Sequence, residues 1–458
     1  MNKLQVGFAR LDIMPALGTP IDGYFFARNV EGSLDTLEVN ALALRVEQTT
    51  TLFLSFDLCL IATAECDKLR RSIAEATGVP FEAIFLHTTH THTGVQVGLK
   101  NLDGGQQTPQ EKELLKEYAD TLCQKAVEVA KLALADCKSA RMGWAVGNAP
   151  KVAFIRRFRM KDGKIRTNPG VGNPNIVYPI GEADERVNVL RFEREGDTLV
   201  LVNFGNHPDT VGGCMVSGDW PGFLRRRLEK ALDNVKCIFF NGAQGDINHI
   251  DVNAKGGDLN DLHEDFDAPR GYGHARHIGN VVAGGVLQVF DKVNYEDVES
   301  LRYLQKFAQI PSNMPKPEEL PLARKYNALH EAGKDEEIPF EGMELTTVVA
   351  EAGRMLALEN GPESFQLELG GVALGNIAMV TIPGEPFTGI GRGLKESEGW
   401  TMVMPMALTN GYEGYFPMKE AYDEGGYEAR SSRYKAGCAE RMIAEGKELL
   451  QKLRENAV

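Results

Sequence analysis

Four apolar segments of this chain end in the same way. Each begins with a run of aliphatic or aromatic residues and continues directly into a polar turn rich in Gly, Asn, Pro or His. The segments are IFLHTTHTHTG (84–94), TLVLVNFGNHP (198–208), VKCIFFNGAQGD (235–246) and NIAMVTIPGEPF (376–387). A short apolar run bounded by turn residues indicates a buried strand. Open α/β sheets collect ligands at such strand ends, so the pattern constrains both the fold and the place of a functional site.

Helix-like segments alternate with the strand-like ones. Amphipathic spacing predicts helices at 64–78, 111–136, 275–293 and 439–456, with Gly78 at a C-cap position, and 51–62 reads as a further buried strand. The alternation predicts an α/β fold, with a mixed β-sheet core flanked by helices. The segment around 303–360 is rich in Lys, Glu and Pro and is expected to be a helical insertion or lid. No repeat or linker divides the chain, so we expect residues 1–458 to form a single domain.

Charge and composition exclude several classes of partner. The net charge of −14 argues against nucleic acid or an anionic membrane, because both repel an acidic protein. No apolar run reaches membrane-spanning length, and the first residues lack the apolar region of a signal peptide. The seven cysteines are scattered without a CxxC pair, which favours reduced thiols. We therefore expect a soluble cytoplasmic protein that acts on a small molecule without stable membrane association, and its oligomeric state stays open.

Three of the nine histidines lie within 84–94. Side chains two residues apart on a strand share a face, which predicts that His90 and His92 project together and that His87 points to the opposite face. Two neighbouring imidazoles suit a metal ion, or one ligand beside one acid–base group. The alternative is a polar strand end with solvated histidines.

The other strand ends supply groups of the same character. They carry His207 after the second segment, Asn241, Gln244, Asp246, Asn248 and His249 after the third, and Glu385 after the fourth. Two or three histidines and one carboxylate can form the ligand shell of a catalytic zinc ion, with one position left open for water.

Some polar residues have a structural interpretation beside the functional one. Asp57 lies inside an apolar run, and a buried carboxylate needs a partner. It either orients a ligand histidine or makes a structural bond to a turn. His274 and His277 lie near a helix start, where capping or packing is the preferred interpretation. The stretch LRRRLEK (224–230) is interpreted as a solvated helix face.

Short motifs spread over nearly the whole chain resemble the catalytic domain of the neutral/alkaline (non-lysosomal) ceramidase family. In order, they are VGFARLDIMPALGTPIDGY (6–24), TTHTHTG (88–94), FIRRFRMKDG (154–163), GNHP (205–208), SGDWPG (217–222), NGAQGDIN (241–248), PGE (383–385) and NGYEGYFPMKEAYDEGGYE (410–428). Each motif is short, but their shared order makes the resemblance specific. Only the segment 303–360 has no counterpart in it.

The resemblance implies one zinc ion and assigns its ligands. Carried over by motif, the ligands are His90, His207, Glu385 and Tyr415, with Tyr412 as the fallback for the tyrosine. His92 would lie beside the metal or stabilise an oxyanion, and Arg157 (or Arg156) and Tyr427 would line the pocket.

The sequence departs from the family in two respects. The family has a serine, the proposed nucleophile, where this chain has Asn248, and an amide cannot be deprotonated to attack a carbonyl. Asn248 and Asp246 of the same turn are still expected to lie in the site. Ceramidases also continue into a C-terminal β-sandwich domain, which we expect this chain to lack.

We therefore expect a zinc-dependent hydrolase in which metal-bound water attacks a carbonyl, of an amide in the first place and of an ester as the other option. His92, Tyr415 and an arginine would stabilise the oxyanion. The paired Arg156 and Arg157 favour a small soluble substrate with an anionic group. The alternatives are a ceramidase-like lipid amidase, another metal-assisted enzyme such as an isomerase or lyase, and a non-catalytic protein that binds a metal or ligand.

Overall fold

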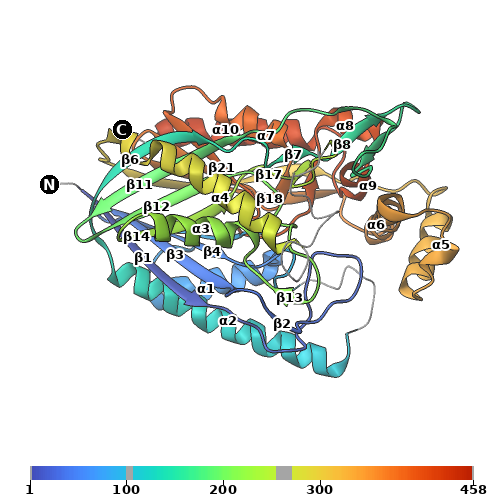
Figure 1. The fold of residues 1–458 in the computed structure, drawn as a ribbon, viewed down its shortest axis with the longest axis horizontal. Helices are drawn as coiled ribbons and strands as arrows, with labels where there is room; N and C mark the ends of the chain where they lie inside the picture. Colours follow the sequence, from blue (N-terminus) through green and yellow to red (C-terminus); the bar gives the residue numbers. More distant parts are fainter. Residues whose placement is uncertain (1–2, 99–106, 254–270, 456–458) are drawn as a thin grey trace.

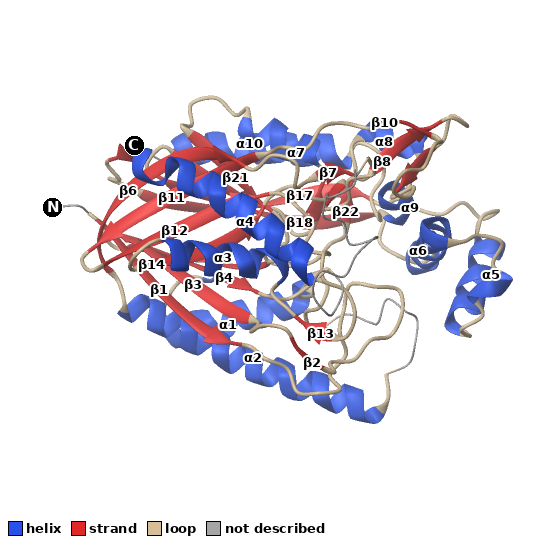
Figure 2. Cartoon of the chain, viewed as in Figure 1, coloured by secondary structure: helices blue, strands red, loops and turns tan. Residues whose placement is uncertain are grey.

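The computed structural model describes residues 3–98, 107–253 and 271–455. It contains a nine-stranded mixed sheet and a four-stranded sheet, with helices on the outer faces (Figures 1 and 2). The large sheet has the order β14-β12-β11-β6-β1-β3-β4-β5, with β16 beside β6, and the small sheet has the order β17-β18-β19-β21. The strands of the large sheet are β1 (Leu4–Asp12), β3 (Glu38–Val46), β4 (Thr49–Phe56), β5 (Ile84–Thr88), β6 (Lys138–Asn148), β11 (Arg186–Arg194), β12 (Asp197–Phe204), β14 (Val235–Asn241) and β16 (Asn294–Glu296). The strands of the small sheet are β17 (Leu301–Pro311), β18 (Ser364–Leu374), β19 (Ile377–Thr381) and β21 (Met402–Met406).

The large sheet consists of two arms, and among the described residues the strand pairing between them is that of Gln5 and Val6 of β1 with the start of β6. One arm holds β1, β3, β4 and β5, and the other holds β6, β11, β12 and β14. The end strand β14 of the second arm approaches the first arm, since Oγ of Ser55 in β4 donates to the carbonyl of Phe239 in β14 at 2.7 Å. Within these two sheets, the parallel pairs are β4 with β5, β12 with β14 and β19 with β21.

Alternate residues of the strands enter different cores. In β3, Val39, Ala41 and Ala43 face the helices, whereas Leu42 and Leu44 face the interior between the arms and the small sheet. This explains why strands such as β3 are apolar on both faces.

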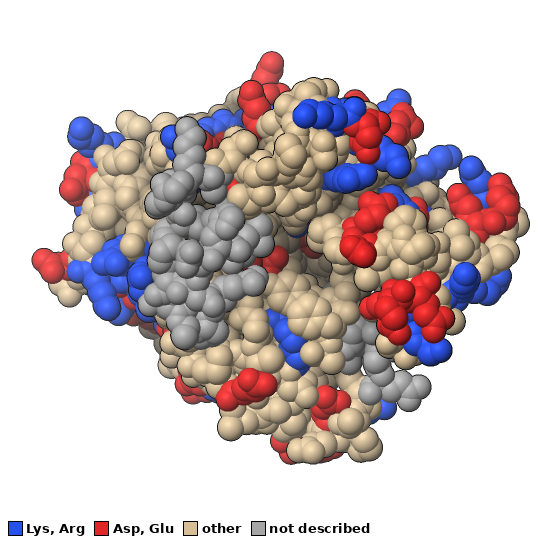
Figure 3. Space-filling view, turned by 45° about the vertical axis from the view of Figure 1, so that its right-hand side comes forward, with Lys and Arg blue, Asp and Glu red and all other residues tan. Residues whose placement is uncertain are grey.

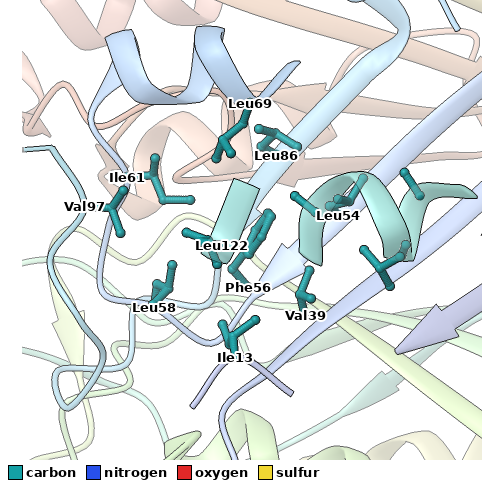
Figure 4. Close-up of a cluster of buried hydrophobic side chains, with 14 of the residues drawn as sticks. Ile13, Val39, Leu54, Phe56, Leu58, Ile61, Leu69, Leu86, Val97 and Leu122 are labelled. Atoms are coloured by element: carbon teal, nitrogen blue, oxygen red, sulfur yellow. The ribbon is translucent and has the colours of Figure 1, made fainter. Parts of the chain in front are cut away.

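Helices cover the outer faces of both sheets. Helices α1 (Thr63–Thr77) and α2 (Pro109–Ala135) cover the β1–β5 arm (Figure 4), and α3 (Asp219–Ala231) and α4 (Tyr272–Val289) cover the other arm. Helices α7 (Thr388–Lys395) and α10 (Cys438–Glu455) cover the small sheet. Gly78 caps α1 in the left-handed conformation, as its sequence position predicted. No helix within the described ranges is long and apolar enough to span a membrane.

The short elements gather at the end of the sheets to which β4, β5, β12 and β14 lead (Figure 1). They are β2 (Gly32–Ser33), β7 (Phe154–Ile155), β8 (Arg157–Met160), β9 (Ile165–Thr167), β10 (Ile176–Pro179), β13 (Met215–Val216), β15 (Ile247–Asn248), β20 (Glu385–Pro386), β22 (Tyr415–Phe416), α8 (Lys419–Glu424) and α9 (Tyr427–Ser431). Three single 3-10 turns lie at Phe81–Ala83, Phe290–Lys292 and Asp335–Glu337.

The helical insertion expected at 303–360 is shorter than predicted. Residues through Pro311 belong to β17, which pairs with β18 along its whole length. Only α5 (Leu320–Glu331) and α6 (Gly342–Leu358) form the insertion, which projects beyond the sheets in Figure 1. The polar composition misled the prediction because β17 is an edge strand of the small sheet and exposes several of its residues.

Asp57 serves a structural role. Its carboxylate accepts bonds from the Arg225 guanidinium at 2.5 and 3.0 Å and from the backbone N–H of Glu38 at 3.0 Å. The carboxylate and the guanidinium are both fully buried, so each provides the counter-charge that the other requires. The pair fixes α3 against β3 and β4.

We predict that Asp57→Ala lowers the free energy of unfolding by about 3–5 kcal/mol, because it leaves Arg225 charged and buried with only Glu38, at 3.2 Å, as an acidic partner. Arg226→Ala is the matched control. Arg226 pairs with Asp35 at 3.1 Å, but its side chain is 34% exposed, so its loss should cost at most about 1 kcal/mol. Urea unfolding followed by circular dichroism measures both, and equal losses would contradict this account of Asp57.

Candidate metal centre

Strand ends from both sheets meet at the candidate site. Nδ2 of Asn203 in β12 donates to the carbonyl of Pro405 in β21 at 2.9 Å, which joins the large sheet to the small one. Oδ1 of Asn410, after β21, accepts from the backbone N–H of Leu86 in β5 at 2.8 Å. Buried amides therefore hold the ends of β5, β12 and β21 together.

Asn241, the last residue of β14, holds the turns that carry the histidines. Its Nδ2 donates to the carbonyl of Thr89 at 3.3 Å and to that of Asn206 at 3.0 Å. Its backbone N–H donates to Nε2 of His87 at 2.9 Å. The turns after β5 and β12 are thus fixed to one side chain.

His90 and His92 lie together, but not because of strand alternation. Strand β5 ends at Thr88, and His90 has a φ of 74°, in the left-handed region that is strained for a residue with a side chain. The turn still places the two Nε2 atoms 3.3 Å apart. His87 points away from them, into the core, where burial lowers its pKa to about 3.

His90 and His207 present Nε2 to the same carboxylate oxygen. Nδ1 of His90 lies 2.7 Å from the carbonyl of Cys59, and Nδ1 of His207 lies 3.1 Å from the carbonyl of Gln244. Because a carbonyl only accepts, each Nδ1 must carry the hydrogen, which leaves the Nε2 lone pair available. The two Nε2 atoms lie 3.5 and 3.3 Å from Oε2 of Glu385.

Glu385 is placed by the turn that precedes it. Gly384 has a φ of 151°, and a Cβ there would lie 2.5 Å from the carbonyl oxygen of Gly414. The close approach lets Glu385 pair with Tyr415 across β20 and β22. A glycine is required at position 384 for this geometry.

The cluster has the features of a metal site. Glu385 is buried, and among the described residues its Oε2 has no hydrogen-bond donor, while its Oε1 accepts from the Tyr412 hydroxyl at 2.9 Å. Burial disfavours the charged form of His90, but the Glu385 carboxylate, the Cys59 carbonyl and Asp209 together raise its pKa above the usual value. Burial, with Arg156 nearby, lowers the pKa of His207 well below its usual range. The Glu385 carboxylate is therefore stabilised by a cation beside it, either a proton or a metal ion. Two imidazole nitrogens and one carboxylate oxygen are ligands that zinc prefers.

A second possible ligand group shares His90. Cys59, His90 and His92 also lie close enough for a metal ion. However, the Cys59 thiol lies 3.8 Å from Nδ1 of His90. That nitrogen donates its hydrogen to the Cys59 carbonyl, so it has no lone pair for a metal ion. Burial also raises the pKa of the thiol well above its usual range. These contacts favour the group of His90, His207 and Glu385.

His92 lies beside the cluster with a carboxylate behind it. Its Nδ1 is 3.3 Å from Oδ1 of Asp209, which in turn accepts from the Tyr24 hydroxyl. Its Nε2 faces His90. Burial and His90 lower the pKa of His92 well below its usual range, which keeps the ring neutral.

The two arginines differ in position. Arg156 lies over the Tyr415 ring at 5.5 Å, and its Nε donates to Glu428 at 2.7 Å. Arg157 instead binds Glu424 at 3.2 Å and the carbonyl of Gly425. Arg156 is therefore the arginine beside the cluster, and carboxylates neutralise both.

Asp246 and Asn248 are held by local bonds. Asp246 accepts from the backbone N–H of Thr388 at 2.7 Å and from its hydroxyl at 2.9 Å, at the start of α7. Nδ2 of Asn248 donates to Asn168 at 2.8 Å, and its Oδ1 accepts from the backbone N–H of Ile250 at 3.0 Å. Both residues support the turn after β14.

Tyr427 completes an aromatic wall, with its ring centroid 5.6 Å from that of Tyr415. Figure 3 shows a hollow near the middle of the face at this end of the molecule. His249 and His274 are buried, with rings 5.4 Å apart. Sequence reasoning did not assign Asp209 or Glu428 to the site: Asp209 carries no motif, and Glu428 was only the last residue of the tyrosine-rich motif 410–428. The signal for Tyr24 was its place at the end of the motif VGFARLDIMPALGTPIDGY (6–24).

Comparisons with known proteins bear on the fold. No protein-family model matches the chain, and no curated protein sequence matches it. The structure is similar to that of neutral ceramidase from Pseudomonas aeruginosa, with a TM-score of 0.73 and 17% identity, over 100% of this chain and 75% of that one. It is also similar to a ceramidase complexed with C2, with a TM-score of 0.70 and 16% identity, over 100% and 76% of the two chains. Over its full length, this chain has the fold of the neutral ceramidases.

Proposed function

We propose that this protein is a zinc-dependent hydrolase that cleaves an amide bond in a small molecule. The donor set of the strand ends supports the proposal, as does the likeness of the fold to structures named as ceramidases. The main observation behind it is the buried Oε2 of Glu385, which lies between Nε2 of His90 and Nε2 of His207. Each of these rings carries its hydrogen on Nδ1, so neither Nε2 donates to the carboxylate. A carboxylate oxygen in such a place is costly without a cation.

In this proposal, His90, His207 and Glu385 hold the metal, and Tyr415 is the fourth ligand. Tyr412 fixes the rotation of the Glu385 carboxylate through its bond to Oε1. A zinc ion bound there would supply Lewis acidity, which polarises a carbonyl and acidifies a water molecule.

His92 is the group best placed to handle the proton of the attacking water. Its Nε2 faces the cluster, and Asp209 lies on the Nδ1 side, where it can hold the ring orientation and stabilise a positive charge. The bond from Tyr24 fixes Asp209 in turn. The proton would thus be accepted at Nε2 and passed to the leaving amine.

Arg156 would stabilise negative charge that develops on the carbonyl oxygen. The paired arginines do not form an anion site, because Glu428 and Glu424 already neutralise them. These ion pairs remove the reason to expect an anionic group on the substrate. We therefore propose that the substrate is a neutral amide.

We predict about one zinc ion per chain. His90→Ala, His207→Ala and Glu385→Ala should each reduce bound zinc to below about a tenth, because each removes one ligand. The control is His330→Ala, since His330 on α5 is bonded to Asp335, away from the cluster. Elemental analysis of the purified variants provides the measurement. Full zinc occupancy in His90→Ala would rule out this ligand shell.

We also predict that no covalent acyl-enzyme forms. Both polar atoms of Asn248 are engaged in bonds, and an amide is no nucleophile, so Asn248→Ala should retain kcat within about tenfold. Rapid-quench mass spectrometry during turnover should find only unmodified protein. A stoichiometric acyl adduct on any side chain would refute attack by water.

A further inference from the structure

Two chains of aromatic contacts run outward from the candidate metal centre. In the first, the ring of Tyr24 lies 5.5 Å from that of His92, and Phe26 stacks on Tyr24 at 5.3 Å with an interplanar angle of 14°. In the second, Tyr427 contacts Tyr415 on one side and Phe25 on the other, at 5.6 and 6.3 Å. Both chains end in the consecutive residues Tyr24, Phe25 and Phe26.

This aromatic segment, residues 24–26, is held in place from several directions. The Tyr24 hydroxyl binds Asp209, and the Arg28 guanidinium lies 4.0 Å from the Tyr24 ring centroid. Nη2 of Arg28 also donates to the carbonyl of His92 at 2.7 Å. A binding surface fixed this firmly loses little conformational entropy when a ligand binds.

The insertion fixes the segment from the opposite side. Phe25 packs into the apolar cluster formed by α5, α6 and the segment between them, which includes Ile338, Val348 and Val349. Helix α6 is in turn bound to α9, because Arg430 pairs with Glu351 at 2.5 Å. The insertion thus supports the site through Phe25 and Tyr427.

Phe26 is 60% exposed, although it stacks on a residue that contacts the centre. A single exposed apolar side chain is ordinary, but Phe26 stacks on Tyr24, which makes an edge contact with a candidate catalytic histidine, so it is placed to contact a ligand at the centre. The exposed face of a phenyl ring suits a flat ring, whereas a long alkyl chain would extend past this one side chain into water.

We propose that Phe26 and Tyr24 form a subsite for an aromatic ring of the substrate, joined by a short spacer to the scissile amide. The inference rests on the proposed amide hydrolysis and names the substrate class. The spacer has to bridge the Tyr24 ring, since Phe26 is separated from His92 by that one side chain.

The test compares two ethylamides, of acetic acid and of 6-phenylhexanoic acid, with the zinc-loaded protein. Phe26→Ala should lower the ratio of kcat/KM for the phenyl substrate to that for the acetyl substrate by roughly tenfold. Phe26→Trp should restore the ratio. The control is Phe307→Ala, because Phe307 on β17 is similarly exposed, at 55%, and contacts none of these rings. Its ratio should equal that of the wild type.

Calorimetric binding of 6-phenylhexanoate and hexanoate separates this proposal from the proposed function. Phe26→Ala should weaken binding of the phenyl acid roughly tenfold more than that of hexanoate. If the wild type hydrolyses neither amide, the proposed function fails, and the binding comparison still decides the subsite. A kinetic or binding ratio within twofold of the wild type in Phe26→Ala would overturn the subsite.

Discussion

The side chain of Asn241 binds two turns that are far apart in the sequence, and its backbone binds a third segment. Its Nδ2 donates to the carbonyls of Thr89 and Asn206, and its own carbonyl accepts from the backbone N–H of Ala407 at 2.9 Å. The segments involved follow β5, β12 and β21. A buried network of this kind is stable only when every member is bonded, so its geometry tolerates little variation. The positions of His90 and His207 follow from it.

The centre also depends on the buried charge of Glu385: burial raises its pKa, but a cation on His90, together with Arg156 and the Tyr412 hydroxyl, lowers it below its usual value. Glu385 is buried, and the neighbouring imidazoles face it with their lone pairs. Backbone carbonyls of Cys59 and Gln244 impose that orientation, because they take the Nδ1 hydrogens. The same rigid turns make the charge of the Glu385 carboxylate unfavourable when no cation is present. They would also hold the three ligand atoms in position for a metal ion. The arrangement links the strand-end fold to the proposed chemistry.

The sequence predicted what depends on local pattern. Apolar runs followed by polar turns located the strand ends, and helical spacing located α1, α2, α4 and α10. The joining of the two arms at Gln5 and Val6 was beyond such reasoning, because it rests on a pairing with residues over 130 positions away. The left-handed φ of His90 was equally hidden, since it is imposed by tertiary contacts. The positions of Arg156 and Arg157 depended on the distant Glu428 and Glu424, which no motif connects to them.

X-ray absorption at the zinc edge of the zinc-loaded protein tests the central claim most directly. The claim is that His90, His207 and Glu385 hold the metal, so the spectrum should contain only nitrogen and oxygen ligands at about 2.0–2.2 Å, with the multiple scattering of imidazole rings. The competing group contains Cys59 in addition to His90 and His92. A sulfur shell at about 2.3 Å would place the metal there and would contradict the assignment of Glu385 as a ligand.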